Sequence, residues 1–75
     1  MFKFFKKNPE SITIRAEEVH CEDRFLYNGT MVQVEALGRN ETMVYLCLVP
    51  VEQLPFTSGA IDDWFYREQF MTITR

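Results

Sequence analysis

The clearest pattern in this sequence is a pair of apolar runs on either side of Asn28-Gly29. The run Phe25-Leu26-Tyr27 precedes this dipeptide and TMVQVEAL (30–37) follows it. Asn-Gly strongly favours the two-residue type I′ turn of a β-hairpin. The pattern therefore predicts two paired strands, over roughly 23–27 and 30–37.

A third strand extends this hairpin into a meander. Gly38-Arg39-Asn40 separates the second strand from TMVYLCLV, which predicts a loop at 38–40 and a strand over roughly 42–49. In the register set by the two turns, Tyr27 lies opposite Thr30, Phe25 opposite Val32, Leu26 opposite Met31, Val34 opposite Val44 and Val32 opposite Leu46. We expect one face of the meander to be the core face, with Phe25, Val32, Val34, Val44 and Leu46. The other face carries Leu26, Met31, Gln33, Tyr45 and Cys47 and is apolar enough to need a cover.

The two ends of the chain predict further elements. SITIRAE (11–17) alternates apolar and polar residues, which is typical of a strand with one wet face. After a loop that follows Pro50, Ser58 is a good N-cap, and Asp62 and Asp63 suit the first turn of a helix. A short helix over roughly 59–69 would place Ile61, Trp64 and Phe65 toward the core, and FMTITR (70–75) predicts a last strand.

The predicted order is β-β-β-β-α-β in a single domain, 1–75. Residues 1–9 form an N-terminal basic and aromatic segment, and residues 10–75 form the compact core. The fold class is α+β and sheet-dominated, with about five strands and one short helix before the last strand. Two architectures fit this order, a small twisted antiparallel sheet or a partly closed β-barrel of the SH3-like or OB-like kind.

Charge is distributed unevenly along the 75 residues. Residues 1–15 carry four basic residues against one acid, a net +3, whereas the other sixty carry four arginines against ten acids, a net −6. Because phosphate contacts supply most non-specific affinity for nucleic acid, an acidic body argues against that class of partner. A partner protein with a basic surface would complement this acidic part of the chain better.

The sequence offers little for catalysis or for a cofactor. His20 and Cys21 are adjacent, so in an extended segment their side chains point to opposite sides and cannot share a proton. Cys21 and Cys47 are too few for a zinc site, and two reduced cysteines favour a cytoplasmic protein. We therefore predict a non-enzymatic protein with no catalytic residue, no cofactor and no metal site.

Two groups of residues are candidates for protein binding. Tyr and Arg are enriched at the energetic centres of protein interfaces, which points to Tyr66 and Arg67 beside Asp62. An acidic cluster is either a solvated loop or a surface for a basic partner, and it comprises Glu17, Glu18, Glu22 and Asp23.

The opening MFKFFKK interleaves Phe2, Phe4 and Phe5 with Lys3, Lys6 and Lys7. Four alternative roles fit this segment: a membrane contact, a nucleic-acid arm, a contact with a partner, or a cover for the second face of the meander. The last reading, on its own domain or across a homodimer, is favoured because buried phenylalanines contribute much to a small core. Lysine stems can lie over such a contact while their charges stay in water.

The sequence thus favours a small regulatory or accessory factor that binds another protein, for example an inhibitor that occludes its partner's site, as viral or bacterial accessory proteins do. One alternative is a small β-barrel that binds single-stranded nucleic acid. Another is a peripheral membrane protein held by residues 1–7.

Overall fold

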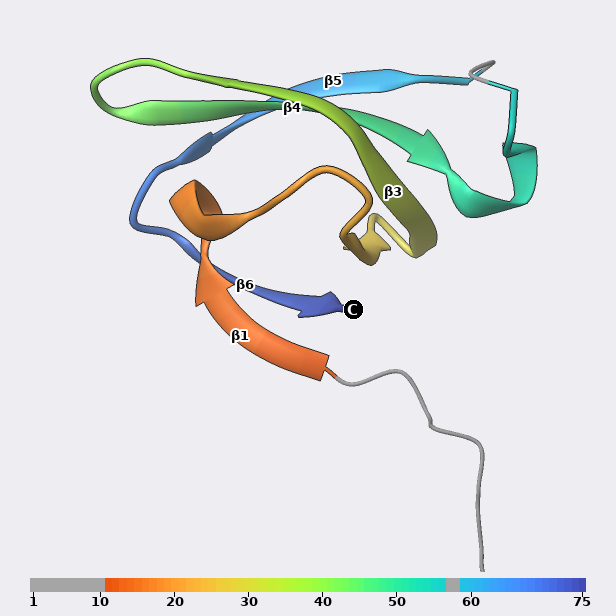
Figure 1. Cartoon of the computed structure of the whole chain (residues 1–75), viewed down its shortest axis with the longest axis horizontal. Coiled ribbons are helices and arrows are strands. Elements are labelled where there is room, and N and C mark those ends of the chain that lie inside the picture. Colours follow the sequence, from red (N-terminus) through yellow and green to blue (C-terminus); the bar gives the residue numbers. More distant parts are fainter. Residues whose placement is uncertain (1–10, 57–58) are drawn as a thin grey trace, which may run out of the picture.

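The computed structural model describes residues 11–56 and 59–75, which form one antiparallel sheet of six strands (Figure 1). The strands are β1 (Ser11–Arg15), β2 (Arg24–Tyr27), β3 (Thr30–Arg39), β4 (Met43–Pro50), β5 (Ile61–Tyr66) and β6 (Phe70–Thr74). Two 3-10 turns accompany them, η1 (Ala16–Glu18) after β1 and η2 (Val51–Gln53) after β4. The strands lie in the order β1-β6-β2-β3-β4-β5.

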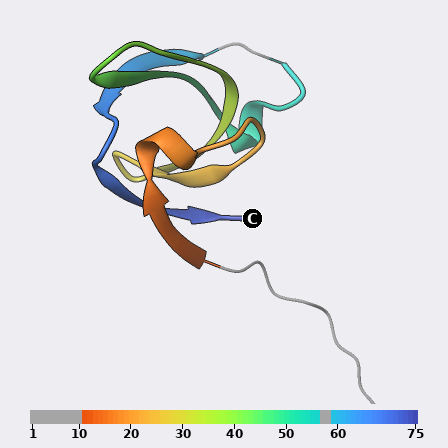
Figure 2. The same ribbon diagram turned by 60° about the vertical axis from the view of Figure 1, so that its left-hand side comes forward.

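The sheet curls on itself without closing into a barrel. Figure 2 shows β3, β4 and β5 arching over β2, β6 and β1. β1 and β5 are the two edges of the sheet, and β2 pairs with β6 only at Arg24 and Thr74. The predicted twisted antiparallel sheet is confirmed, with one strand more than expected.

The β2–β3 hairpin forms as the sequence predicts. Tyr27 pairs with Thr30, and Phe25 pairs with Val32. Asn28 and Gly29 have φ angles of 50° and 83°, the left-handed conformation that both central residues of a type I′ turn require. The local turn chemistry therefore fixes this register without help from the rest of the fold.

The predicted register between β3 and β4 is wrong. Val34 pairs with Leu48 instead of Val44, because β3 continues to Arg39 and the turn follows it. Asn40 forms this turn, since its side-chain oxygen accepts the N–H groups of Thr42 and Met43 at 2.9 and 2.8 Å. The offset of four residues is even, so each side chain keeps its face. All five residues of the predicted core face are accordingly buried.

A β-bulge between Val34 and Ala36 changes the alternation along β3. Beyond it Leu37 lies opposite Leu46 and packs against the core, and Arg39 lies opposite Val44. Because a bulge inserts one extra residue, it redirects every following side chain to the other face. The bulge thereby directs Arg39 toward η1, where its guanidinium reaches the Glu17 carbonyl at 2.7 Å.

The predicted helix over 59–69 is wrong, because its centre is strand β5, paired with β4 over Met43–Leu48. Among the described residues, helical structure is confined to η1 and η2. Aromatic and β-branched side chains favour strands, and pairing with an apolar strand such as β4 outweighs a weak local helix preference. As a consequence Trp64 points away from the core instead of into it, and half of it is exposed.

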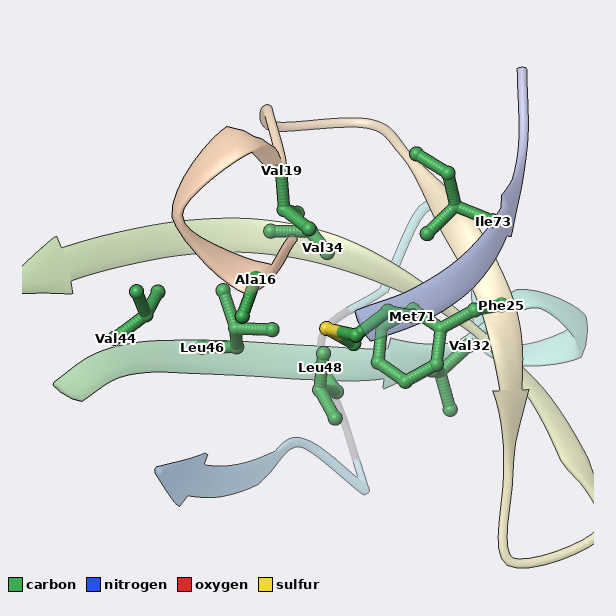
Figure 3. Close-up of a cluster of buried hydrophobic side chains, with 10 residues drawn as sticks. All are labelled: Ala16, Val19, Phe25, Val32, Val34, Val44, Leu46, Leu48, Met71 and Ile73. Atoms are coloured by element: carbon green, nitrogen blue, oxygen red, sulfur yellow. The ribbon is translucent and has the colours of Figure 1, made fainter. Parts of the chain in front are cut away.

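The core lies inside the curled sheet and is closed at one end by η1. Figure 3 shows its side chains gathered between β4, η1 and β6. The predicted strand over 11–17 forms only as far as Arg15, as β1. Its alternation ends at Ala16, which begins η1 and is fully buried together with Val19. The buried cluster comprises Ala16, Val19, Phe25, Val32, Val34, Val44, Leu46, Leu48, Met71 and Ile73.

Truncation of Leu46, which is fully buried at the centre of this cluster, tests the core assignment. Leu46→Ala should lower the free energy of unfolding by about 2–5 kcal/mol, through lost burial and the cavity left behind. Urea denaturation followed by tryptophan fluorescence measures the change. Phe56→Ala removes a larger side chain that is 71% exposed, and its cost should stay below about 1 kcal/mol. Equal losses in the two variants would contradict the core described here.

Candidate functional site

The outer face of β4 and β5 carries an aromatic strip formed by Tyr45, Trp64 and Tyr66. Along β5 the side chains alternate, with Phe65 opposite the buried Val44 and Trp64 opposite Tyr45. The rings of Tyr45 and Trp64 lie 5.4 Å apart at an angle of 54°. Trp64 is 50% and Tyr66 66% exposed, so the strip presents two large aromatic side chains to solvent from an edge strand.

Asp62 borders the strip at the end opposite Tyr66. It lies beside Cys47 in the β4–β5 pairing. Its hydrogen bond with the Tyr45 hydroxyl is the main reason that the pKa of Tyr45 is raised, and burial adds to it. Burial, followed by the interaction with Asp62, raises the pKa of the Cys47 thiol. Cys47 therefore stays protonated at neutral pH and lacks the thiolate character of a nucleophile.

The backbone along the free edge of β5 is partly occupied. Arg67 donates its N–H to the Thr42 carbonyl at 3.0 Å, just beyond the β4–β5 pairing. By the alternation of antiparallel hydrogen bonds, the N–H and C=O groups of Trp64 and Tyr66 then point away from β4. The Trp64 N–H donates to the Asp63 carboxylate at 2.8 Å, and the Tyr66 carbonyl accepts the Gln69 N–H at 3.1 Å. These bonds impede the addition of another strand, so the side chains are the accessible part of this edge.

A hollow of about 590 Å³ adjoins Tyr66 where β5 meets η1. Its lining residues include three of the predicted docking residues, Glu17, Tyr66 and Arg67. The Arg67 guanidinium contacts one oxygen of the Glu17 carboxylate at 3.1 Å, and that of Arg15 contacts the other at 3.1 Å. The remaining lining residues are Glu41, Thr42 and Glu68.

Glu17 anchors this junction. The hydrogen bond from Arg15 lowers the pKa of Glu17 most, partial burial opposes it, and the bond from Arg67 lowers it further. The Glu17 N–H also donates to the Arg67 carbonyl at 3.1 Å. Arg67 is thereby held between η1 and the β3–β4 turn, where it reaches the Asn40 carbonyl at 3.4 Å. These bonds tie the residue that follows β5 to η1 and to the β3–β4 turn.

The predicted acidic cluster does not form one surface. The Glu18 carboxylate accepts the Arg15 N–H at 2.9 Å and so closes the η1 turn. Glu22 is exposed, with a φ of 77° in the turn before β2. Asp23 is only 5% exposed and binds the Arg75 guanidinium at 2.9 Å and the His20 N–H at 2.8 Å. Asp23 therefore acts within the fold, and only Glu17 belongs to the hollow beside Tyr66.

Sequence reasoning missed Trp64 as a surface residue, whereas it placed Tyr45 on the outer face of the meander and expected a cover there. The predicted helix placed Trp64 in the core, although a period of two over 61–66 would have placed it outside. The predicted contact residues Phe2, Phe4, Phe5, Lys3, Lys6 and Lys7 lie outside the described residues.

The ion pair of Asp23 predicts a specific acid sensitivity. Burial raises the pKa of Asp23, but the bonds from Arg75 and the His20 N–H outweigh it and hold that pKa below its ordinary value. Its stabilising contribution is therefore complete above the ordinary aspartate pKa of about 4 and is lost as pH falls through the lower folded-state pKa. Asp23→Asn should cost about 1.5–3 kcal/mol at pH 7. It should also flatten the dependence of unfolding free energy on pH below about 4.

Urea denaturation between about pH 2 and 7 measures both effects. Glu22→Gln is the matched control, because it neutralises the adjacent exposed carboxylate and should leave the pH profile close to that of the parent. An unchanged acid profile in Asp23→Asn would contradict the role given to this pair.

Comparison of the chain with protein-family models, curated proteins and solved structures finds no match. Within residues 11–56 and 59–75, no helix is long and apolar enough to cross a membrane. The same residues contain no group of three or more His, Cys, Asp and Glu side chains placed to hold a metal ion. The site is accordingly defined by its own geometry, an aromatic strip on an edge strand that ends in a charged hollow.

Proposed function

We propose that this protein is a non-enzymatic accessory factor that binds a partner protein through the aromatic strip. The observation that carries the proposal is the alternation of β5, which exposes Trp64 and Tyr66 side by side with Tyr45. Tryptophan and tyrosine supply much of the binding energy at protein interfaces, since they bury a large area at little conformational cost.

The rigidity of the strip supports a docking role. Tyr45 is held by Asp62, Trp64 packs against Tyr45, and the backbone at Tyr66 is bonded to Gln69. A surface that is already ordered loses little entropy when a partner binds. The adjacent hollow, with the Glu17–Arg67 pair on its wall, offers polar contacts around the apolar strip. An apolar centre with a polar rim is the usual anatomy of a protein interface.

A regulatory action follows from this mode of binding. Around the strip, Arg67 pairs with Glu17 and Tyr45 is bonded to Asp62, and burial and Asp62 raise the pKa of the Cys47 thiol. Such a surface acts by occupying a partner's surface, so inhibition by occlusion is the simplest outcome. The direction of regulation depends on which surface of the partner is covered.

A single-stranded nucleic acid is the rival ligand for exposed aromatic rings, because bases stack on them. Its phosphates need nearby cations, whereas β4 and β5 carry Asp62 and Asp63 and no basic residue. Arg67, just beyond β5, already pairs with Glu17. The charge of the strip thus favours a protein partner over nucleic acid.

The proposal predicts that Trp64→Ala with Tyr66→Ala abolishes partner capture without unfolding the protein. The tagged full-length chain is incubated with nuclease-treated lysate, and bound protein is quantified by mass spectrometry. The double variant should retain at least about tenfold less of the stoichiometric partner, since central aromatic residues each contribute about 2 kcal/mol or more. Far-ultraviolet circular dichroism verifies that the fold is intact.

Phe56→Ala is the matched control, because it removes an exposed ring that lies outside the strip. This variant should capture the partner as the parent does. Capture that persists in the Trp64/Tyr66 variant would refute the assignment of the strip. Recovery of nucleic acid from untreated lysate, with affinity that falls steeply as salt rises, would favour the rival function instead.

A further inference from the structure

A second apolar surface lies on the outer face of β2, β3 and β6, apart from the aromatic strip. Its members are Leu26, Met31 and Phe70, here named the Leu26 patch, and they are 65%, 40% and 70% exposed. Leu26 and Met31 are direct partners across the β2–β3 hairpin. Phe70 begins β6, the next strand of the sheet. Three large apolar side chains thus share one face with no cover among the described residues.

Hollows border the Leu26 patch on two sides. β2 and β6 pair at a single position, and an opening of about 290 Å³ beyond it is lined by Leu26, Tyr27 and Phe70 among others. A hollow of about 360 Å³ lies beside Met31 and is lined by Val51 and Glu52 as well. Both openings are large enough to admit an aromatic side chain.

The start of the chain brings suitable residues within reach. Ser11 pairs with Thr74, which pairs with Arg24, so the first described residue lies two strand spacings, or about 10 Å, from β2. Leu26 is about 7 Å further along that strand. Phe5 precedes Ser11 by six residues and Phe2 by nine, which allows an extended chain to span about 20–30 Å.

Charge complements this geometry. Residues 1–10 carry three lysines and one glutamate, whereas residues 11–75 carry five arginines and ten acids. Glu52 lies in the hollow beside Met31, and Glu35 lies further along β3 from Met31. Glu52 therefore offers a carboxylate beside the patch to a lysine that follows the phenylalanines, and Arg24, exposed on the same face of β2, is bonded to Gln33.

We propose that residues 1–7 pack on the Leu26 patch of their own chain. The phenylalanine rings cover Leu26, Met31 and Phe70, and the lysines stay at the rim, facing Glu35 and Glu52. A second copy offers the same chemistry, but a short tether gives the attached segment an effective concentration in the millimolar range. The aromatic strip on β4 and β5 is left open, so this contact is independent of the proposed partner site.

Photo-crosslinking in the full-length chain tests the contact. Phe4 is replaced by p-benzoylphenylalanine, whose excited ketone inserts into nearby C–H bonds, and the illuminated protein is digested with trypsin. Cleavage after arginine places Leu26 and Met31 in 25–39 and Phe70 in 68–75. The peptide 40–67 contains both the strip and the residues of the hollow beside Met31, so its fragment spectra distinguish crosslinks at Tyr45, Trp64 or Tyr66 from those at Val51 or Glu52. We expect crosslinks within one chain to 25–39 and 68–75. Mixing isotope-labelled with unlabelled chains distinguishes these from crosslinks between copies.

The double substitution Leu26→Gln with Met31→Gln tests the patch itself, because both side chains are exposed and become polar. It should lower the yield of these crosslinks at least about fivefold, since the phenylalanines lose apolar contact area. The same yield in this variant, crosslinks mainly to Tyr45, Trp64 or Tyr66, crosslinks only between copies, or no crosslink to protein would each overturn the proposal.

Discussion

The packing of Phe65 and Asp63 on the inner face of β5 determines what this protein presents to solvent. The ring of Phe65 meets those of Phe25 and Tyr27 edge-on, with centroids 6.2 and 6.4 Å apart. The Tyr27 hydroxyl donates to the Asp63 carboxylate at 2.5 Å, a bond that raises the pKa of Tyr27. These contacts join β5 to β2, which is not its neighbour in the sheet. Because side chains alternate along a strand, they also direct Trp64 outward.

The sequence was informative where local chemistry decides the structure and misleading where distant residues decide it. Asn28-Gly29 specifies its turn, so the first hairpin and its register could be predicted. Strand β5 could not be predicted in this way, because Asp63 is a charged residue on the inner face and interrupts the alternation of apolar and polar residues that marks a strand. Its partner Tyr27 lies 36 residues earlier. The β3–β4 register depended on a later turn, at Asn40, and on a bulge that has no local signal.

The candidate site shows the same division. Composition alone singled out Tyr66 and Arg67, since their residue types are common at interfaces. The contact that positions them links Glu17 to Arg67 across 50 residues, and it exists only because the β5–β6 turn returns to η1. Likewise Asp23 was grouped with its acidic neighbours in sequence. Its side chain instead bonds to Arg75, 52 residues later, and is held within the fold. Proximity in sequence is thus a poor guide to which carboxylates share a surface.

A sheet this small has more apolar surface than its own elements can cover. One side of the curl encloses the core, which leaves the outer face of every strand to solvent or to another segment. The two apolar areas on that face differ in kind. The aromatic strip is ordered by its own ring contact and hydrogen bonds, whereas the Leu26 patch borders strands that pair at one position only. An ordered surface suits an external partner, and an incompletely paired one suits a tethered segment that completes the fold.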